Sequence, residues 1–84
     1  MNDDSFEFLS NEYAQALQAF ATIENQAATL LLMGHSAELR DFIDQFLLMA
    51  GRARDVAEDR GEQNFVEWFG ELIEKAQKLR TTAR

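Results

Sequence analysis

The sequence predicts an all-α protein that folds as an antiparallel three-helix bundle. Apolar residues recur at steps of three and four along most of the 84 residues, which is the spacing of one face of an α-helix. The chain has no proline, and its four glycines stand singly, at or within the helical segments. Alternating runs rich in Val, Ile and Thr, which are typical of strands, do not occur. We expect a single helical domain over residues 1–84.

The first predicted helix, residues 6–33, is the longest. Ser5 is a suitable N-cap, and Gly34 is a natural C-terminal stop. The apolar seam of this helix consists of Phe6, Leu9, Tyr13, Ala16, Phe20, Ile23, Ala27 and Leu30. A second line of small residues lies beside the seam: Ala14, Ala21 and Ala28. These alanines fit either a solvated helix face or the close approach of another helix.

The second predicted helix covers residues 37–60 and follows Ser36 as its N-cap. Gly51 lies inside it and marks a kink or a close contact, or is simply a weak helix former. Gly61 ends the helix. The predicted seam of this helix consists of Leu39, Phe42, Phe46, Met49, Ala53 and Val56.

The third predicted helix covers residues 64–80, with Asn64 as its N-cap and a frayed tail over residues 81–84. Trp68 lies at the edge of its seam, where we expect partial burial, and an interface anchor is the alternative. The predicted seam consists of Phe65, Phe69, Leu72, Ala76 and Leu79.

Helix lengths predict where the bundle is incompletely covered. At 1.5 Å per residue the three helices span about 42, 36 and 26 Å. A third helix that starts beside the beginning of the first would stop well short of the first helix's end. The apolar tip of the hairpin formed by the first two helices would then be exposed, and we expect it to contact a second copy or a partner protein. The predicted interface consists of Leu30, Leu31, Leu32, Met33, Leu39, Phe42, Ile43, Phe46 and Leu47. The alternative is that the third helix covers this tip, which leaves a monomer.

The net charge of the chain limits the classes of molecule that it is expected to bind. The net charge is −7, and residues 1–37 contribute five acidic and no basic residues. This charge opposes direct binding to nucleic acid or to an anionic membrane, so we expect neither. A protein partner with an apolar or basic surface fits better. Between Ser5 and Ala37 the only charged residues are Glu7, Glu12 and Glu24, which is unusually few for a solvated helix.

Three further observations concern the class of protein. The absence of cysteine excludes disulfides and thiolate metal sites. The amino-terminal residues do not form a signal peptide, and no apolar run approaches transmembrane length. We expect a cytoplasmic protein without a cofactor.

Few residues in the sequence are candidates for a catalytic or metal-binding site. The single histidine, His35, lies between Gly34 and Ser36 and is expected to be a turn residue. Carboxylates at i,i+3 spacing could hold magnesium between paired helices: Asp41 and Asp44, Asp55 and Glu58, and Glu71 and Glu74. Over Asp55 to Glu74 this pattern resembles the all-α nucleoside triphosphate pyrophosphatases, which implies a magnesium-dependent enzyme. Basic residues beside these pairs favour ordinary surface ion pairs, so we expect no catalytic or metal site.

Taken together, these features predict a small acidic interaction module of the adaptor, regulator or chaperone type, self-associating as a homodimer through the hairpin tip. One alternative is an acidic inhibitor of a basic nucleic-acid-binding protein, of the phage or immunity type. The other is the pyrophosphatase-like enzyme. An apolar interface should be nearly insensitive to salt, whereas an acidic inhibitor should lose affinity as salt rises.

Overall fold

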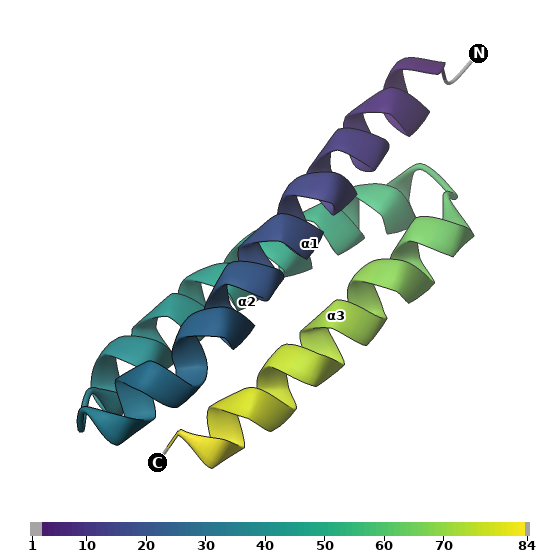
Figure 1. The fold of residues 1–84 in the computed structure, drawn as a ribbon. Coiled ribbons are helices and arrows are strands. Elements are labelled where there is room, and N and C mark those ends of the chain that lie inside the picture. Colours follow the sequence, from purple (N-terminus) through teal and green to yellow (C-terminus); the bar gives the residue numbers. More distant parts are fainter. Residues whose placement is uncertain (1–2, 84) are drawn as a thin grey trace.

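The computed structural model describes residues 3–83, and within them three α-helices run up, down and up (Figure 1). Helix α1 covers Asp3–Leu32, α2 covers Ser36–Asp59 and α3 covers Gln63–Thr82. No strand occurs in the described part of the chain. The predicted all-α, antiparallel three-helix bundle is therefore confirmed.

Short turns join the helices, and each contains a glycine with a left-handed backbone. Gly34 has a φ of 77° and Gly61 a φ of 71°, a region that residues with a side chain rarely adopt. After α1 the amide of His35 donates a hydrogen bond to the carbonyl of Leu30 (2.7 Å), and an equivalent bond closes α2. These bonds satisfy carbonyl groups that would otherwise be unpaired at the helix ends. The predicted stops at both glycines are thus confirmed.

The helices begin earlier than predicted. Ser5, Ser36 and Asn64, the predicted N-caps, all lie inside their helices. The residues at the N-cap positions of α2 and α3, His35 and Glu62, make no side-chain capping hydrogen bond. The glycine turns, which direct the chain straight into the next helix, therefore decide where α2 and α3 begin.

The carboxyl-terminal end of α3 is ordered against α2, contrary to the predicted frayed tail. Thr81 and Thr82 are helical and the side chain of Ala83 is fully buried; Arg84 lies outside the described residues. The Arg80 guanidinium donates two hydrogen bonds to the Asp44 carboxylate, at 2.6 and 3.2 Å. These contacts fasten the end of α3 to the first half of α2.

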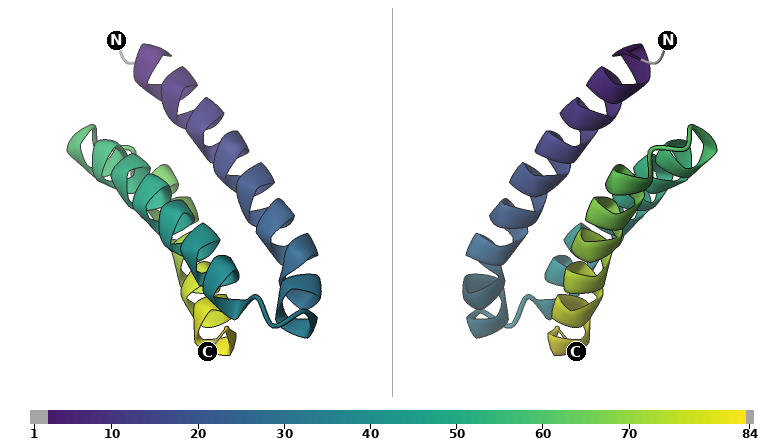
Figure 2. Two further views of the ribbon diagram at one scale, coloured as in Figure 1. Left: turned by 90° about the vertical axis from the view of Figure 1, so that its left-hand side faces the viewer. Right: turned by 90° about the vertical axis from the view of Figure 1, so that its right-hand side faces the viewer.

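The third helix consequently does not stop well short of the α1–α2 turn. It returns along α2, and the two helices differ by only four residues, or about 6 Å. The carboxyl-terminal end of α3 lies near the α1–α2 turn, whereas the amino-terminal end of α1 projects past the α2–α3 turn (Figures 1 and 2). The predicted overhang is therefore at the opposite end of the bundle, because the reach of α3 is set by α2 and not by α1.

The hydrophobic core runs along α2, which packs against both other helices. No polar or charged side chain is buried among the residues whose burial is described. The core is made by small and large apolar residues: Leu9, Ala16, Phe20, Ile23, Ala27, Leu39, Ile43, Phe46, Ala50, Ala53, Ala57, Phe65, Phe69, Leu72, Ala76 and Ala83.

The buried stripe of α2 is rotated relative to the predicted seam. Half of the predicted positions are buried: Leu39, Phe46 and Ala53. The other buried positions are Ile43, Ala50 and Ala57, whereas Phe42, Met49 and Val56 lie at the edge of the core. This rotation follows from the double contact of α2, because a helix packed between two neighbours buries the stripe that faces both.

Helix α1 diverges from the α2–α3 pair toward its amino-terminal end (Figure 2), and its contacts with α3 are the fewest in the bundle. Aromatic side chains bridge this wider separation. The ring of Tyr13 lies 5.4 Å from that of Phe69 and 5.6 Å from that of Trp68, and the Phe6 ring lies 5.5 Å from that of Phe65. Large rings span a distance between helix axes that aliphatic side chains would leave empty.

Replacing Gly51 by alanine should stabilise the protein. Helix α2 continues through Gly51, and an added Cβ would meet no atom within 4 Å. We expect Gly51→Ala to raise the free energy of unfolding by about 0.5–1 kcal/mol, because alanine is the better helix former. Gly34→Ala is the control: it also has space, but its positive φ should make the same change destabilising by about 1–2 kcal/mol. Urea denaturation measures both, and a loss of stability in Gly51→Ala would contradict this account.

The Asp44–Arg80 pair should make stability depend on pH. The hydrogen bonds from Arg80 lower the pKa of Asp44 below its ordinary value of 3.8. A carboxyl group with a lowered pKa in the folded state stabilises the fold above its unfolded-state pKa, and this stabilisation disappears as pH falls through the folded-state pKa. Asp44→Asn should therefore be less stable than wild type at pH 7 and close to it at pH 2.

Asp41→Asn, on the same helix and without a bonded partner, is the matched control and should differ little from wild type at either pH. Urea denaturation at the two pH values provides the comparison. A deficit in Asp44→Asn that is unchanged at pH 2 would show that the pair does not act through its charge.

Candidate protein-interaction surface

The structure divides the nine predicted interface residues into three groups. One group lies in the core of the bundle: Leu39, Ile43 and Phe46, with at most 3% exposure. A second group is half-buried and packs against the core: Leu30, Leu31 and Leu47. The exposed group consists of Leu32, Met33 and Phe42, at 88%, 62% and 38%. The last group is the part of the predicted surface that another molecule can reach.

Leu32 and Met33 are exposed because of the turn that follows them. Leu32 ends α1, and the amide of Met33 still bonds to the carbonyl of Thr29 (3.0 Å). The left-handed Gly34 then reverses the chain within one residue. The two side chains are thus held at the end of the hairpin, where they remain exposed.

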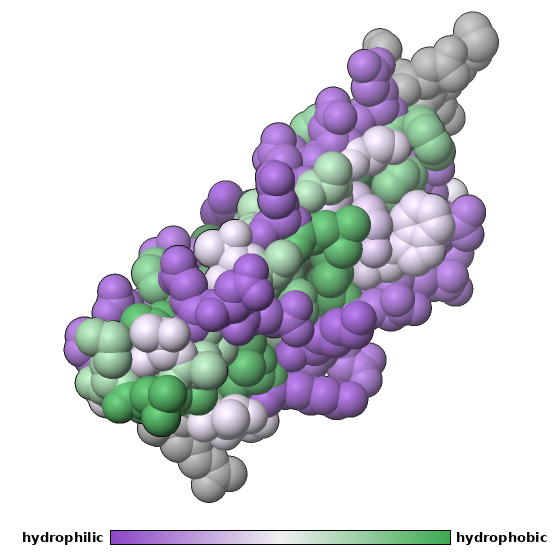
Figure 3. All heavy atoms as spheres, viewed as in Figure 1, coloured by the Kyte–Doolittle hydropathy of each residue, from purple (hydrophilic) through white to green (hydrophobic). Residues whose placement is uncertain are grey.

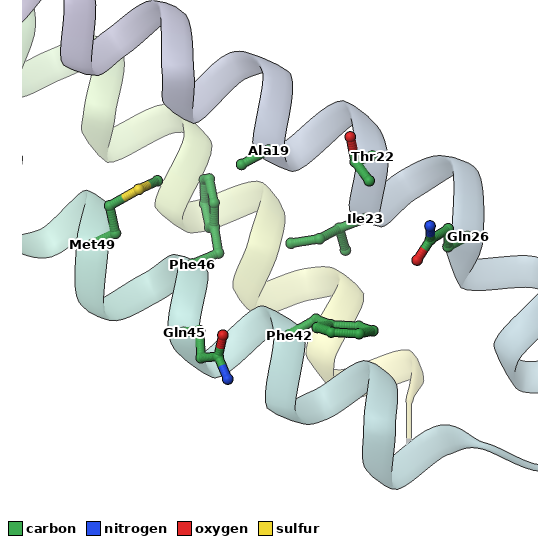
Figure 4. A pocket seen from close by; sticks show the side chains of 8 residues that line it. All are labelled: Ala19, Thr22, Ile23, Gln26, Phe42, Gln45, Phe46 and Met49. Atoms are coloured by element: carbon green, nitrogen blue, oxygen red, sulfur yellow. The ribbon is translucent and has the colours of Figure 1, made fainter.

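Phe42 lines an apolar groove between α1 and α2 with a volume of about 570 Å³. Helix α1 contributes Ala19, Thr22, Ile23 and Gln26, and α2 contributes Phe42, Gln45, Phe46 and Met49. Ile23 and Phe46 project between the two helices and form the floor, and Phe42 lies nearer the turn (Figure 4). All eight lining residues are uncharged.

A smaller hollow of about 200 Å³ continues the groove toward the amino-terminal end of α1. Met49 lines both hollows, so they form one surface along the hairpin, which we call the α1–α2 groove. The lining residues of the continuation are Phe8, Glu12, Met49, Arg52, Ala53 and Val56. The guanidinium of Arg60 lies 5.9 Å from the centre of the Phe8 ring, which fixes a positive charge near this end.

The α1–α2 groove was not predicted from the sequence. Phe42, Met49 and Val56 were assigned to the core seam, Phe42 also to the interface at the hairpin tip, and Phe8 to no seam. Their spacing of seven residues on α2 is the signal that could have revealed a second apolar line, because residues seven apart lie on one face of a helix. Two adjacent apolar lines on α2 imply two surfaces to cover.

A second hydrophobic area lies at the junction of α1 and α3. Figure 3 shows hydrophobic atoms along this junction and near the α1–α2 turn, with hydrophilic atoms at the rims. Phe6 and Leu17 are exposed at 58% and 45%, and Trp68 at 40%. The Trp68 ring packs 5.2 Å from that of Phe65 as well as against Tyr13, so its expected partial burial is confirmed.

Of the polar candidates, His35, Asp44 and Glu74 form surface ion pairs. His35 Nδ1 lies 3.1 Å from a carboxylate oxygen of Glu38, in the turn where it was predicted. Glu74 lies 3.8 Å from Lys78, and Glu71 shares a shallow hollow with Lys75. No group of three or more histidine and acidic side chains in the described residues is placed to hold a metal ion.

Comparison of the chain with protein-family models, with curated proteins and with solved structures gives no match. Among the described residues, no helix combines the length and apolar character needed to cross a lipid bilayer.

Proposed function

We propose that this protein is a small helical interaction module that self-associates through the exposed apolar surface of the α1–α2 hairpin, and that it acts as an adaptor, regulator or chaperone. The observation that carries the proposal is the α1–α2 groove, whose larger hollow is lined only by uncharged residues, with Phe42 at its rim and the exposed Leu32 and Met33 at the end of the same hairpin. Apolar surface gathered in this way is typical of protein-binding sites on small soluble domains.

The composition of α1 supports the same proposal. From Tyr13 to Leu32 its only charged residue is Glu24, and the residues of this stretch that line the groove, Ala19, Thr22, Ile23 and Gln26, are all uncharged. A solvated helix face ordinarily carries many more charges. Contact with another protein would cover a face that carries few charged side chains for water to solvate. It would also add stability to a domain whose hydrophobic core is narrow.

A charge at Phe42 should abolish self-association without unfolding the chain. We expect wild type to have a molar mass of twice 9.6 kDa at micromolar concentration, by light scattering after size-exclusion chromatography. Phe42→Glu should be a monomer with an unchanged helical circular dichroism spectrum, because the side chain lies at the rim of the groove. Leu17→Glu is the matched control: Leu17 is more exposed (45%) than Phe42 and lines neither hollow, so this variant should remain a dimer.

The dependence of binding on salt concentration distinguishes this proposal from the acidic-inhibitor alternative. Self-association through a mainly apolar groove should not weaken as salt rises, because the mutual repulsion of two chains of net charge −7 is screened. Binding to a basic partner should weaken steeply. A wild-type chain that stays monomeric at all salt concentrations, up to about 1 mM protein, would contradict the proposal.

A further inference from the structure

We infer that two copies of this chain pack groove to groove in an antiparallel arrangement, with α2 of one copy against α2 of the other and a two-fold axis at Met49. This inference rests on the proposed self-association and specifies its geometry. Four features of the α1–α2 groove lead to it: its apolar line, its position on the bundle, the charges at its ends and its area.

The apolar line of the groove on α2 is Phe42, Met49 and Val56. These residues repeat every seven positions, which is the pattern of a helix that pairs with another helix. Met49 lies at the centre of this line and lines both hollows. An axis at Met49 places Phe42 of each copy against Val56 of the other, so each Phe42 ring fills the smaller hollow of the other copy.

The groove is open on the side of the hairpin away from α3. All of its lining residues come from α1 and α2. In the left view of Figure 2, α1 and α2 stand side by side and α3 lies behind α2. A second pair of α1 and α2 helices can therefore pack against the groove without displacing any part of the bundle.

The charges at the two ends of the groove determine the direction. Glu38 lies one turn before Phe42 on the same face of α2, at the end near the α1–α2 turn. Arg52 lines the other end, and Arg60 lies beside Phe8 there. Parallel packing would bring Glu38 close to Glu38 and the arginines close to the arginines. Antiparallel packing brings Glu38 toward Arg60 of the other copy, which favours this direction.

The area of the face supports an interface along the whole groove. Helix α2 is about 36 Å long and the bundle is 17 Å across, so the α1–α2 face covers about 600 Å² in each copy. Two such faces bury about 1,200 Å², the lower limit for a specific protein interface. Leu32 and Met33 at the hairpin end cover only a small fraction of this area, so the groove and not the hairpin end is the centre of the interface.

Cysteine cross-linking tests the position of the axis, because the chain contains no cysteine of its own. A disulfide requires Cβ atoms about 3.8 Å apart, which across a two-fold axis is met only by residues close to that axis. Under mild oxidation Met49→Cys should become a covalent dimer. Gln77→Cys, at an exposed position on α3, and Leu32→Cys, at the hairpin end, should remain uncrosslinked.

Three outcomes separate this inference from the proposed function. Rapid cross-linking of Met49→Cys, with neither Gln77→Cys nor Leu32→Cys cross-linked, supports both the groove-to-groove packing and the self-association. Cross-linking of Leu32→Cys but not Met49→Cys overturns the groove-to-groove packing while self-association through the hairpin stands. A wild-type chain that is monomeric, with none of the three variants cross-linked, overturns both.

A charge reversal tests the antiparallel direction independently. Glu38→Arg should weaken the dimer about five-fold at low salt, because it brings two positive charges together at each end of the interface. Combining it with Arg60→Glu should restore the wild-type affinity, while Arg60→Glu alone should be weakened like Glu38→Arg. Analytical ultracentrifugation measures the dissociation constants. If the double variant instead loses as much dimer affinity as the two single variants together, the antiparallel direction is overturned.

Discussion

The double contact of α2 with α1 and α3 is the constraint on which the rest of this bundle depends. It rotates the buried stripe of α2 so that Ile43, Ala50 and Ala57 enter the core. It also keeps α3 packed along α2 as far as Arg80, which donates a hydrogen bond to Asp44. Helix α1 makes more contacts with α2 than with α3, and it diverges from both toward its amino-terminal end. Three helices arranged like this leave one apolar edge of α2 facing outward beside α1.

That outward edge connects the fold to the proposed function. Phe42, Met49 and Val56 are apolar, yet they are not enclosed by the bundle, and the groove they form with α1 contains only uncharged residues at its centre. Under the proposed function, the uncharged α1 residues that line the groove have the same explanation, since a helix that contacts another protein needs fewer solvated side chains. Acidic residues remain at other faces, where their charge opposes the approach of a polyanion.

The helices and turns could be predicted from the sequence because they depend on local signals. Residues spaced by three and four marked each helix, and Gly34 and Gly61 marked the stops, which the left-handed backbone at both positions explains. The predicted N-caps of α2 and α3 were wrong by one and two residues, since a glycine turn leads into each of these helices without a capping side chain.

The surface could not be predicted in the same way, because it depends on how the helices are placed in space. Phe42 and Ile43 are adjacent and both apolar, and only the position of α3 decides that Ile43 is buried and Phe42 is not. Nor does helix length alone show that α3 reaches the α1–α2 turn. Of the nine residues predicted for the interface, Leu32, Met33 and Phe42 are left exposed by this packing.

The most direct measurement is an isotope-filtered nuclear Overhauser experiment on a mixture of ¹³C-labelled and unlabelled chains. Phe42 and Val56 lie about 21 Å apart along one α2 helix, so a cross-peak between them cannot arise within one chain. Groove-to-groove packing predicts a strong intermolecular cross-peak between the Phe42 ring and the Val56 methyl groups. A dimeric sample without this cross-peak, or one whose intermolecular contacts involve only Leu32 and Met33, would contradict the account.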